Sequence, residues 1–143
     1  MIISICCSSG LALAGCERSG SGTAGDQFRV APDHVMARRT LQLDGREINS
    51  QQMDLARIDT VVGAETTELW TIHNTHNQPH NFHIHGVAFQ IIPDGAAGAD
   101  PGLGWKDTVL LAAGETVRLA IRFGPYEDRL TPYMYHCHLM WHE

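Results

Sequence analysis

The chain has 143 residues, a formal net charge of −6 and 43% hydrophobic residues, values that are typical of one folded domain. With 18% charged residues and only 10 Lys and Arg, it matches neither a disordered chain nor a nucleic-acid-binding protein. Every histidine except His34 lies between residues 73 and 85 or between residues 136 and 142. This clustering points to metal binding.

The chain begins with an apolar run, MIISICCSSGLALAGC. At about 15 residues, the run is too short to span a membrane and is typical of the apolar part of a signal peptide. It ends in a pattern like a bacterial lipobox, in which Cys16 would be lipidated. We therefore expect residues 1–16 to be a leader and the protein to lie in the cell envelope, periplasmic or anchored by lipid. No Lys or Arg precedes the run, so a wrongly assigned start joined to the domain stays open.

Residues 17–37 begin with ERSGSGTAGDQ and predict a flexible linker. From residue 38 to residue 143, short strand-like segments alternate with turn residues, and no long helical period occurs. The expected strands are RTLQL, DLARIDTVV, TELWTIHN, HNFHIHGVAFQII, DTVLLAA, TVRLAIRF and PYMYHCHLM. This pattern predicts an all-β domain, an antiparallel β-sandwich of Greek-key type.

The alternation of side chains along a strand sorts the histidines into two groups. His83 and His85 share one face of their strand, and His136 and His138 share one face of the last strand. His80 and Cys137 point to the opposite faces of the same strands, and His142 can join them through a short loop. Pairing the two strands thus predicts four imidazoles on one side and a thiol with two imidazoles on the other.

The group of His80, Cys137 and His142 has the ligands of a mononuclear blue-copper site, which transfers electrons. The four-histidine group suits copper that binds dioxygen or water. Since His136 and His138 are covalent neighbours of Cys137, an electron that reaches the sulfur has a through-bond path to the second group.

Simpler interpretations exist for each part. An HxH pair alone more often binds zinc or belongs to a cupin, and a single cysteine in a strand is usually an inert buried thiol. A structural zinc site could use Cys137, His138 and His142. The agreement of both motifs on the same faces favours copper. His34, His73 and His76 lack this agreement, and we expect them to be loop or surface residues.

HNFHIHGVAFQII together with YMYHCHLMWHE resembles the C-terminal cupredoxin domain of the multicopper oxidases, the family of laccases and bacterial cuprous oxidases. The resemblance extends over residues 38–143 and implies a cupredoxin-like Greek-key β-sandwich. It implies that His80, Cys137 and His142 bind type 1 copper, that His83 binds type 2 copper, and that the type 3 pair is bound by the remaining histidines, His85, His136 and His138. Glu143 resembles the carboxylate that helps to deliver protons to bound oxygen.

Two departures from the family pattern follow from the same residues. The axial ligand and the closing strand would come after His142, so we expect a domain that lacks its final strand and has an exposed edge. No HxH pair occurs in residues 1–79, so the chain carries half of the type 2 and type 3 ligands. An N-terminal cupredoxin domain or a second chain would have to complete the trinuclear cluster.

Besides a zinc-binding structural domain, two functions stay open. The first is the terminal domain of a copper oxidase, which couples one-electron oxidation of a phenolic substrate or cuprous ion to the reduction of dioxygen. The second is a stand-alone blue-copper carrier or copper-binding protein tethered to the envelope. A pure electron carrier has no use for the four-histidine group, and this favours oxidase ancestry.

Overall fold

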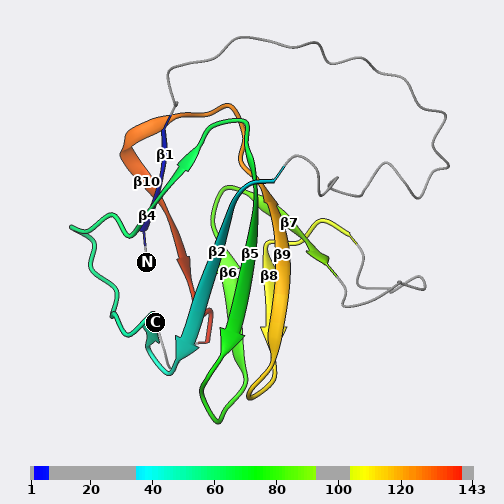
Figure 1. The fold of residues 1–143 in the computed structure, drawn as a ribbon. Helices are drawn as coiled ribbons and strands as arrows, with labels where there is room; N and C mark the ends of the chain where they lie inside the picture. The colour runs from blue at the N-terminus through cyan, green and yellow to red at the C-terminus, as the bar shows by residue number, and fades with distance from the viewer. Residues whose placement is uncertain (1, 7–34, 93–103, 140–143) are drawn as a thin grey trace, which may run out of the picture.

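The computed structural model describes residues 2–6, 35–92 and 104–139, and these residues form two β-sheets without any helix. The strands are β1 (Ile2–Cys6), β2 (Val35–Asp44), β3 (Glu47–Ile48), β4 (Thr60–Gly63), β5 (Thr67–Asn74), β6 (His80–Ile84), β7 (Ala88–Ile92), β8 (Thr108–Leu111), β9 (Thr116–Arg122) and β10 (Asp128–His136). One sheet has the order β4-β1-β10-β6-β8 and the other β3-β2-β5-β9-β7. Figure 1 shows β2, β5 and β9 running side by side.

The strands alternate between core and surface, as a two-layer sandwich requires. Every second residue of β5 and β6 is buried, and the buried residues of both sheets form one hydrophobic cluster. Trp70 lies at its centre, with ring centroids 5.5 Å from Tyr135, 6.2 Å from Phe123 and 6.3 Å from Phe82. The predicted β-sandwich is therefore confirmed, and an aromatic core joins its layers.

The expectation that all strands pair in antiparallel fashion is wrong. β2 pairs with β5 in parallel, and β1 pairs with β4 in parallel, whereas the other pairs are antiparallel. The strand expected for residues 54–62 is also shorter, because β4 begins only at Thr60. Before it, the carboxylate of Asp54 accepts a hydrogen bond from the Ala56 amide at 2.9 Å, which favours a turn.

The segment 80–92, expected to be one strand, forms two strands that belong to different sheets. Gly86 separates them with φ +73°, a left-handed conformation that glycine adopts without strain. A Cβ at this position would lie 2.6 Å from the Tyr133 ring, so there is no room for a side chain. The turn at Gly86 therefore ends β6 directly after the histidine motif.

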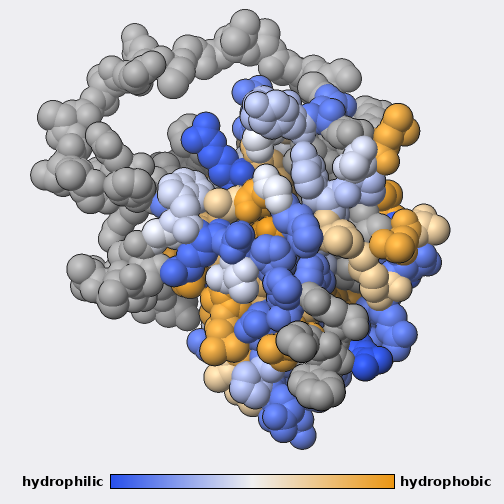
Figure 2. Space-filling view, turned by 180° about the vertical axis from the view of Figure 1, so that it is seen from behind, coloured by the Kyte–Doolittle hydropathy of each residue, from blue (hydrophilic) through white to orange (hydrophobic). Residues whose placement is uncertain are grey.

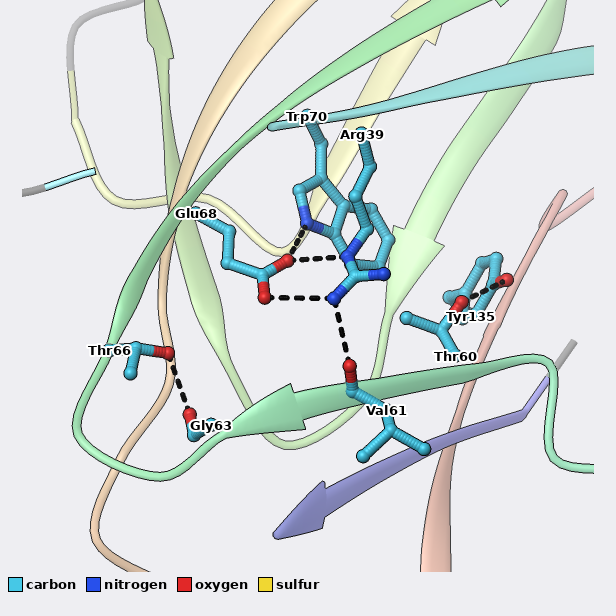
Figure 3. A network of polar contacts seen from close by, with 8 residues as sticks. All are labelled: Arg39, Thr60, Val61, Gly63, Thr66, Glu68, Trp70 and Tyr135. Carbon is cyan, nitrogen blue, oxygen red and sulfur yellow. Dashed lines mark hydrogen bonds and ion pairs between the residues drawn. The ribbon is translucent and has the colours of Figure 1, made fainter. Parts of the chain in front are cut away.

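An ion pair with a buried carboxylate and a half-buried guanidinium connects three strands beside the aromatic core (Figure 3). The carboxylate of Glu68 on β5 accepts hydrogen bonds from the guanidinium of Arg39 on β2, at 2.6 and 3.0 Å, and from the Trp70 indole at 2.8 Å. Arg39 also donates to the carbonyl of Val61 on β4 at 2.8 Å. Each Glu68 oxygen thus has a partner, which offsets the cost of burying its charge.

The first residues of the chain form part of a sheet. β1 lies between β4 and β10, so β10 is paired on both sides, by β1 and by β6. The expected exposed edge is therefore not found along β10. Residues 2–6 belong to the predicted leader, and cleavage at Cys16 would remove them from the sheet.

Residues 7–34, including Cys16, and residues 140–143 lie outside the described part. Among the described residues, no helix is long and apolar enough to cross a membrane.

A chain that begins at residue 17 lacks β1, so β4 and β10 lose the neighbour that they share. Each lost backbone hydrogen bond contributes about 0.5–1.5 kcal/mol, and we expect the free energy of unfolding to fall by several times that amount in urea denaturation of the metal-free chain. Ser4→Pro keeps the length and should destabilise less, by removing one donor within β1. Ser8→Pro, outside β1, is the control. Equal stability of the truncated and full chains would exclude a structural role for β1 and favour the interpretation of residues 1–16 as a leader.

Candidate metal centre

The pairing of β6 with β10 positions the predicted ligands. Tyr135 is opposite Ile84 and His136 is opposite His83 in this antiparallel pair. Ile84 and Tyr135 are buried in the core, so their neighbours His83 and His136 point to the outer face of the sheet. The same alternation turns His80 and Cys137 inward, and both are buried.

The inner group is a buried imidazole beside a buried thiol. Nδ1 of His80 lies 3.2 Å from Sγ of Cys137, and the two residues are 0% and 8% exposed. Cys137 forms no disulfide. A thiolate and an imidazole nitrogen, held together away from water, are a donor set that suits copper. His142, the third predicted ligand of this group, lies outside the described residues.

The outer group brings four imidazoles together. The ring centroid of His83 lies 4.8 Å from that of His85, 5.5 Å from that of His136 and 5.2 Å from that of His138. Ligand atoms of His83, His85 and His136 all lie within 4.8 Å of one another, close enough to hold a metal ion. Strand alternation predicted both groupings; that these residues bind copper stays a prediction.

Hydrogen bonds orient the outer imidazoles. Nδ1 of His83 lies 3.0 Å from the carbonyl oxygen of Asp107 and 2.8 Å from the hydroxyl of Thr108. A carbonyl only accepts, so His83 donates from Nδ1 and keeps the lone pair of Nε2 for a ligand. Nδ1 of His136 lies 3.1 Å from the Cys137 carbonyl and donates to it, so Nε2 of His136 also keeps its lone pair. That atom is 3.0 Å from Nε2 of His85.

Burial lowers the pKa of His85 below its ordinary value, and the imidazoles of His83, His136 and His138 lower it further. The carboxylate of Asp107 acts in the opposite direction. A neutral imidazole is the form that binds a metal. The lowered pKa therefore favours the neutral, metal-binding form of His85 down to a lower pH than for an ordinary imidazole.

Two hollows border the outer imidazoles. One, of about 640 Å³, is open and is lined by His83, His85, Trp105, Lys106 and Asp107 among others. The other, of about 440 Å³, presents mostly apolar surface, is lined by Leu43, Ile48 and Met53 among others, and also borders Cys137 and His138. Figure 2 shows hydrophilic residues extending from the top to the bottom of the face drawn, with hydrophobic residues mainly toward its right edge and its lower left.

The remaining predicted site residues fare differently. Glu143, like His142, lies outside the described residues. His73 is half-buried on β5. His76 lies in a loop, as expected, but is not a free surface residue, because its ring contacts His80 at 2.9 Å. Sequence reasoning missed this contact because strand alternation says nothing about a loop between two strands.

Comparisons with known proteins point to one family. Residues 27–143 match the family model described as multicopper oxidase. The chain is 36% identical over 97 residues to a laccase of Bacillus subtilis, and this match covers 54% of the present chain and 18% of the laccase. It is 30% identical over 114 residues to the multicopper oxidase mco of Staphylococcus aureus, with 73% of this chain and 25% of that protein covered.

The solved structure of the laccase-like multicopper oxidase CueO from Ochrobactrum sp. superposes with a TM-score of 0.68 at 26% identity. The superposed region covers 79% of this chain and 29% of the CueO chain. The chain thus matches about a fifth to a quarter of the length of these curated relatives.

The lowered pKa of His85 gives a prediction that needs no metal. In an NMR titration of the metal-free chain, His85 should titrate below 6.5. Asp107→Asn should lower the pKa further, because the carboxylate that favours the protonated form is removed. Asp54→Asn, whose carboxylate contacts Ala56 and Arg57 instead, is the control.

The same shift makes stability depend on pH. Between the lowered pKa and 6.5, the unfolded chain binds more protons at His85 than the folded chain does. The contribution of His85 to the free energy of unfolding is therefore fully present above pH 6.5 and is lost as the pH falls towards the pKa of His85 in the folded state. A His85 pKa at or above 6.5, or an unchanged pKa in Asp107→Asn, would contradict this account.

Proposed function

Because the chain belongs to the multicopper oxidase family, we propose that it is the copper-binding terminal domain of an oxidase that couples one-electron oxidation of a substrate to the reduction of dioxygen. The observation that carries this proposal is the arrangement around β10. A buried thiol–imidazole pair lies on one side and four imidazoles lie on the other, and a single peptide unit connects them.

Copper, when bound, would supply one-electron transfer at the inner group and dioxygen reduction to water at a trinuclear site that includes the outer group. His80, Cys137 and His142 would hold the type 1 ion. His83 would hold the type 2 ion, and the type 3 pair would be held by His85, His136 and His138. The chemistry of the donors fits, since soft thiolate and imidazole ligands suit copper.

The chain's own residues would act in three ways. The burial of His80 and Cys137, which are 0% and 8% exposed, shields the thiolate from most of the solvent. The contacts of Asp107 and Thr108 orient the His83 ring and hold its proton on Nδ1, which leaves Nε2 available to a ligand. The peptide bonds from Cys137 to His136 and to His138 give an electron a short covalent route between the groups. Glu143 would hold a proton for the oxygen reaction.

The partners follow from what the chain carries. It has no HxH pair in residues 1–79, so an N-terminal cupredoxin domain or a second chain would supply the remaining ligands of the trinuclear site. The open hollow beside His83 and His85 leaves room for such ligands to approach. The reducing substrate would be a phenol or cuprous ion. An envelope location, with Cys16 as a lipid anchor, is compatible with this role, provided that residues 2–6 are not needed in the sheet.

Copper loading tests the inner group. The full chain with one equivalent of Cu²⁺ should show an intense absorption in the red region, because charge transfer from a thiolate to copper gives such a band. Cys137→Ser should abolish the band, and Cys16→Ser, which changes a thiol outside the predicted ligand set, should leave it intact. A wild-type copper complex without the band would refute the type 1 assignment.

Oxygen consumption tests the need for a partner. The purified chain, copper-loaded and supplied with a phenolic or cuprous donor, should consume little oxygen, because half of the trinuclear ligands are missing. An added domain that carries HxH pairs should raise the rate, and His85→Ala together with His136→Ala should remove the gain. Substantial turnover by a proven monomer would refute the half-cluster proposal. A chain that shows the red-region band but gains no oxygen consumption from the added domain would favour a blue-copper carrier.

A further inference from the structure

The loop between β5 and β6 carries a histidine that the proposed ligand set does not use. His76 is half-buried, and its Nδ1 lies 2.9 Å from Nε2 of His80. The two rings meet edge to face, with centroids 5.0 Å apart and an interplanar angle of 76°. His80 is therefore contacted at both ring nitrogens, by Cys137 at Nδ1 and by His76 at Nε2.

The backbone of this loop is anchored independently of the His76 ring. Asn74, which is fully buried, donates from its side-chain nitrogen to the carbonyls of Gln78 and Ala112, both at 2.9 Å. Its side-chain oxygen accepts the backbone amide of His76 at 3.1 Å. Changing the imidazole of His76 should therefore leave the loop in place.

The positions of the protons follow from what each nitrogen must do. A ring nitrogen that binds a metal carries no proton, so a His80 that coordinates through Nδ1 carries its proton on Nε2. Nε2 then donates to Nδ1 of His76, which accepts. With the opposite polarity, His80 would be protonated at Nδ1 and could not coordinate beside Cys137. The direction of the His76–His80 hydrogen bond thus selects the tautomer of His80.

We propose that His76 is a positioning residue for the type 1 copper site, holding the His80 ring in place and in the tautomer that presents Nδ1 beside Cys137. This role rests on the proposed function, because it assigns His80 as a copper ligand. A histidine that binds a metal almost always donates its other N–H to an acceptor that orients the ring and makes the ligand more basic. Here that acceptor is a second imidazole.

Copper affinity gives the first test. Loss of such an orienting partner typically weakens metal binding by about 10–100-fold, and we expect His76→Ala to weaken Cu²⁺ binding at the site with the red-region band by that factor, in competition with a chelator. The midpoint potential should rise, because a less basic His80 stabilises Cu²⁺ less. His76→Asn, which offers a carbonyl oxygen near the place of Nδ1, should restore most of the affinity. His73→Ala, a half-buried histidine on β5, is the matched control.

The metal-free protein gives the second test. ¹⁵N NMR of the imidazoles should show His80 with its proton on Nε2 in the wild type and in His73→Ala, and a mixture of tautomers in His76→Ala. Circular dichroism of each variant checks that the sandwich is folded. This test needs no copper and no oxidase activity.

The outcomes separate the two proposals. A wild-type copper complex without the thiolate band refutes the type 1 site and, with it, this role of His76. If the band is present and His76→Ala matches the wild type in affinity and potential, the proposed function stands and the role of His76 is wrong. A proton on Nδ1 of His80 in the metal-free wild type, or a tautomer unaffected by His76→Ala, also overturns the inference.

Discussion

The register between β6 and β10 determines where every described candidate ligand lies. Two residue pairs, Tyr135 with Ile84 and His136 with His83, define this register. Side chains alternate along a strand, so a slip of one residue would turn the imidazoles inward and the thiol outward. The separation into a buried inner pair and an outer histidine group depends on this one alignment.

The aromatic core protects that register. Tyr135 packs edge to face on Trp70 and lies 6.1 Å from Phe82, which places a buried residue of β10 against buried residues of β5 and β6. Its hydroxyl lies 3.1 Å from that of Thr60, and burial raises the pKa of Tyr135, so the phenol stays neutral and hydrogen-bonded. A slipped strand would expose these rings and leave the hydroxyl without its partner.

The sequence predicted the parts of the fold that depend on local alternation. The strand expected at residues 67–74 matches β5, and the grouping of the histidines by faces agrees with the structure. Features set by tertiary contacts were missed. The turn at Gly86, where the chain changes sheets, lies against the Tyr133 ring, and residues 2–6 pair with two strands more than fifty residues away. The contact of His76 with His80 belongs to the same class, because a loop has no period that places its side chains.

The inner and outer groups are linked at the end of β10, where consecutive residues of the chain belong to both. The strand stops at His136, so Cys137 and His138 lie just beyond its hydrogen-bonded ladder. Residues past the end of a ladder are less restrained than those within it, and bonds to a metal ion would restrain them. His136 is already held in the ladder opposite His83, whereas His138 follows Cys137 directly, so an ion held by Cys137 would also restrain the backbone of His138. Loading of the inner group should therefore restrain the one imidazole of the outer group that lies beyond the ladder, that of His138.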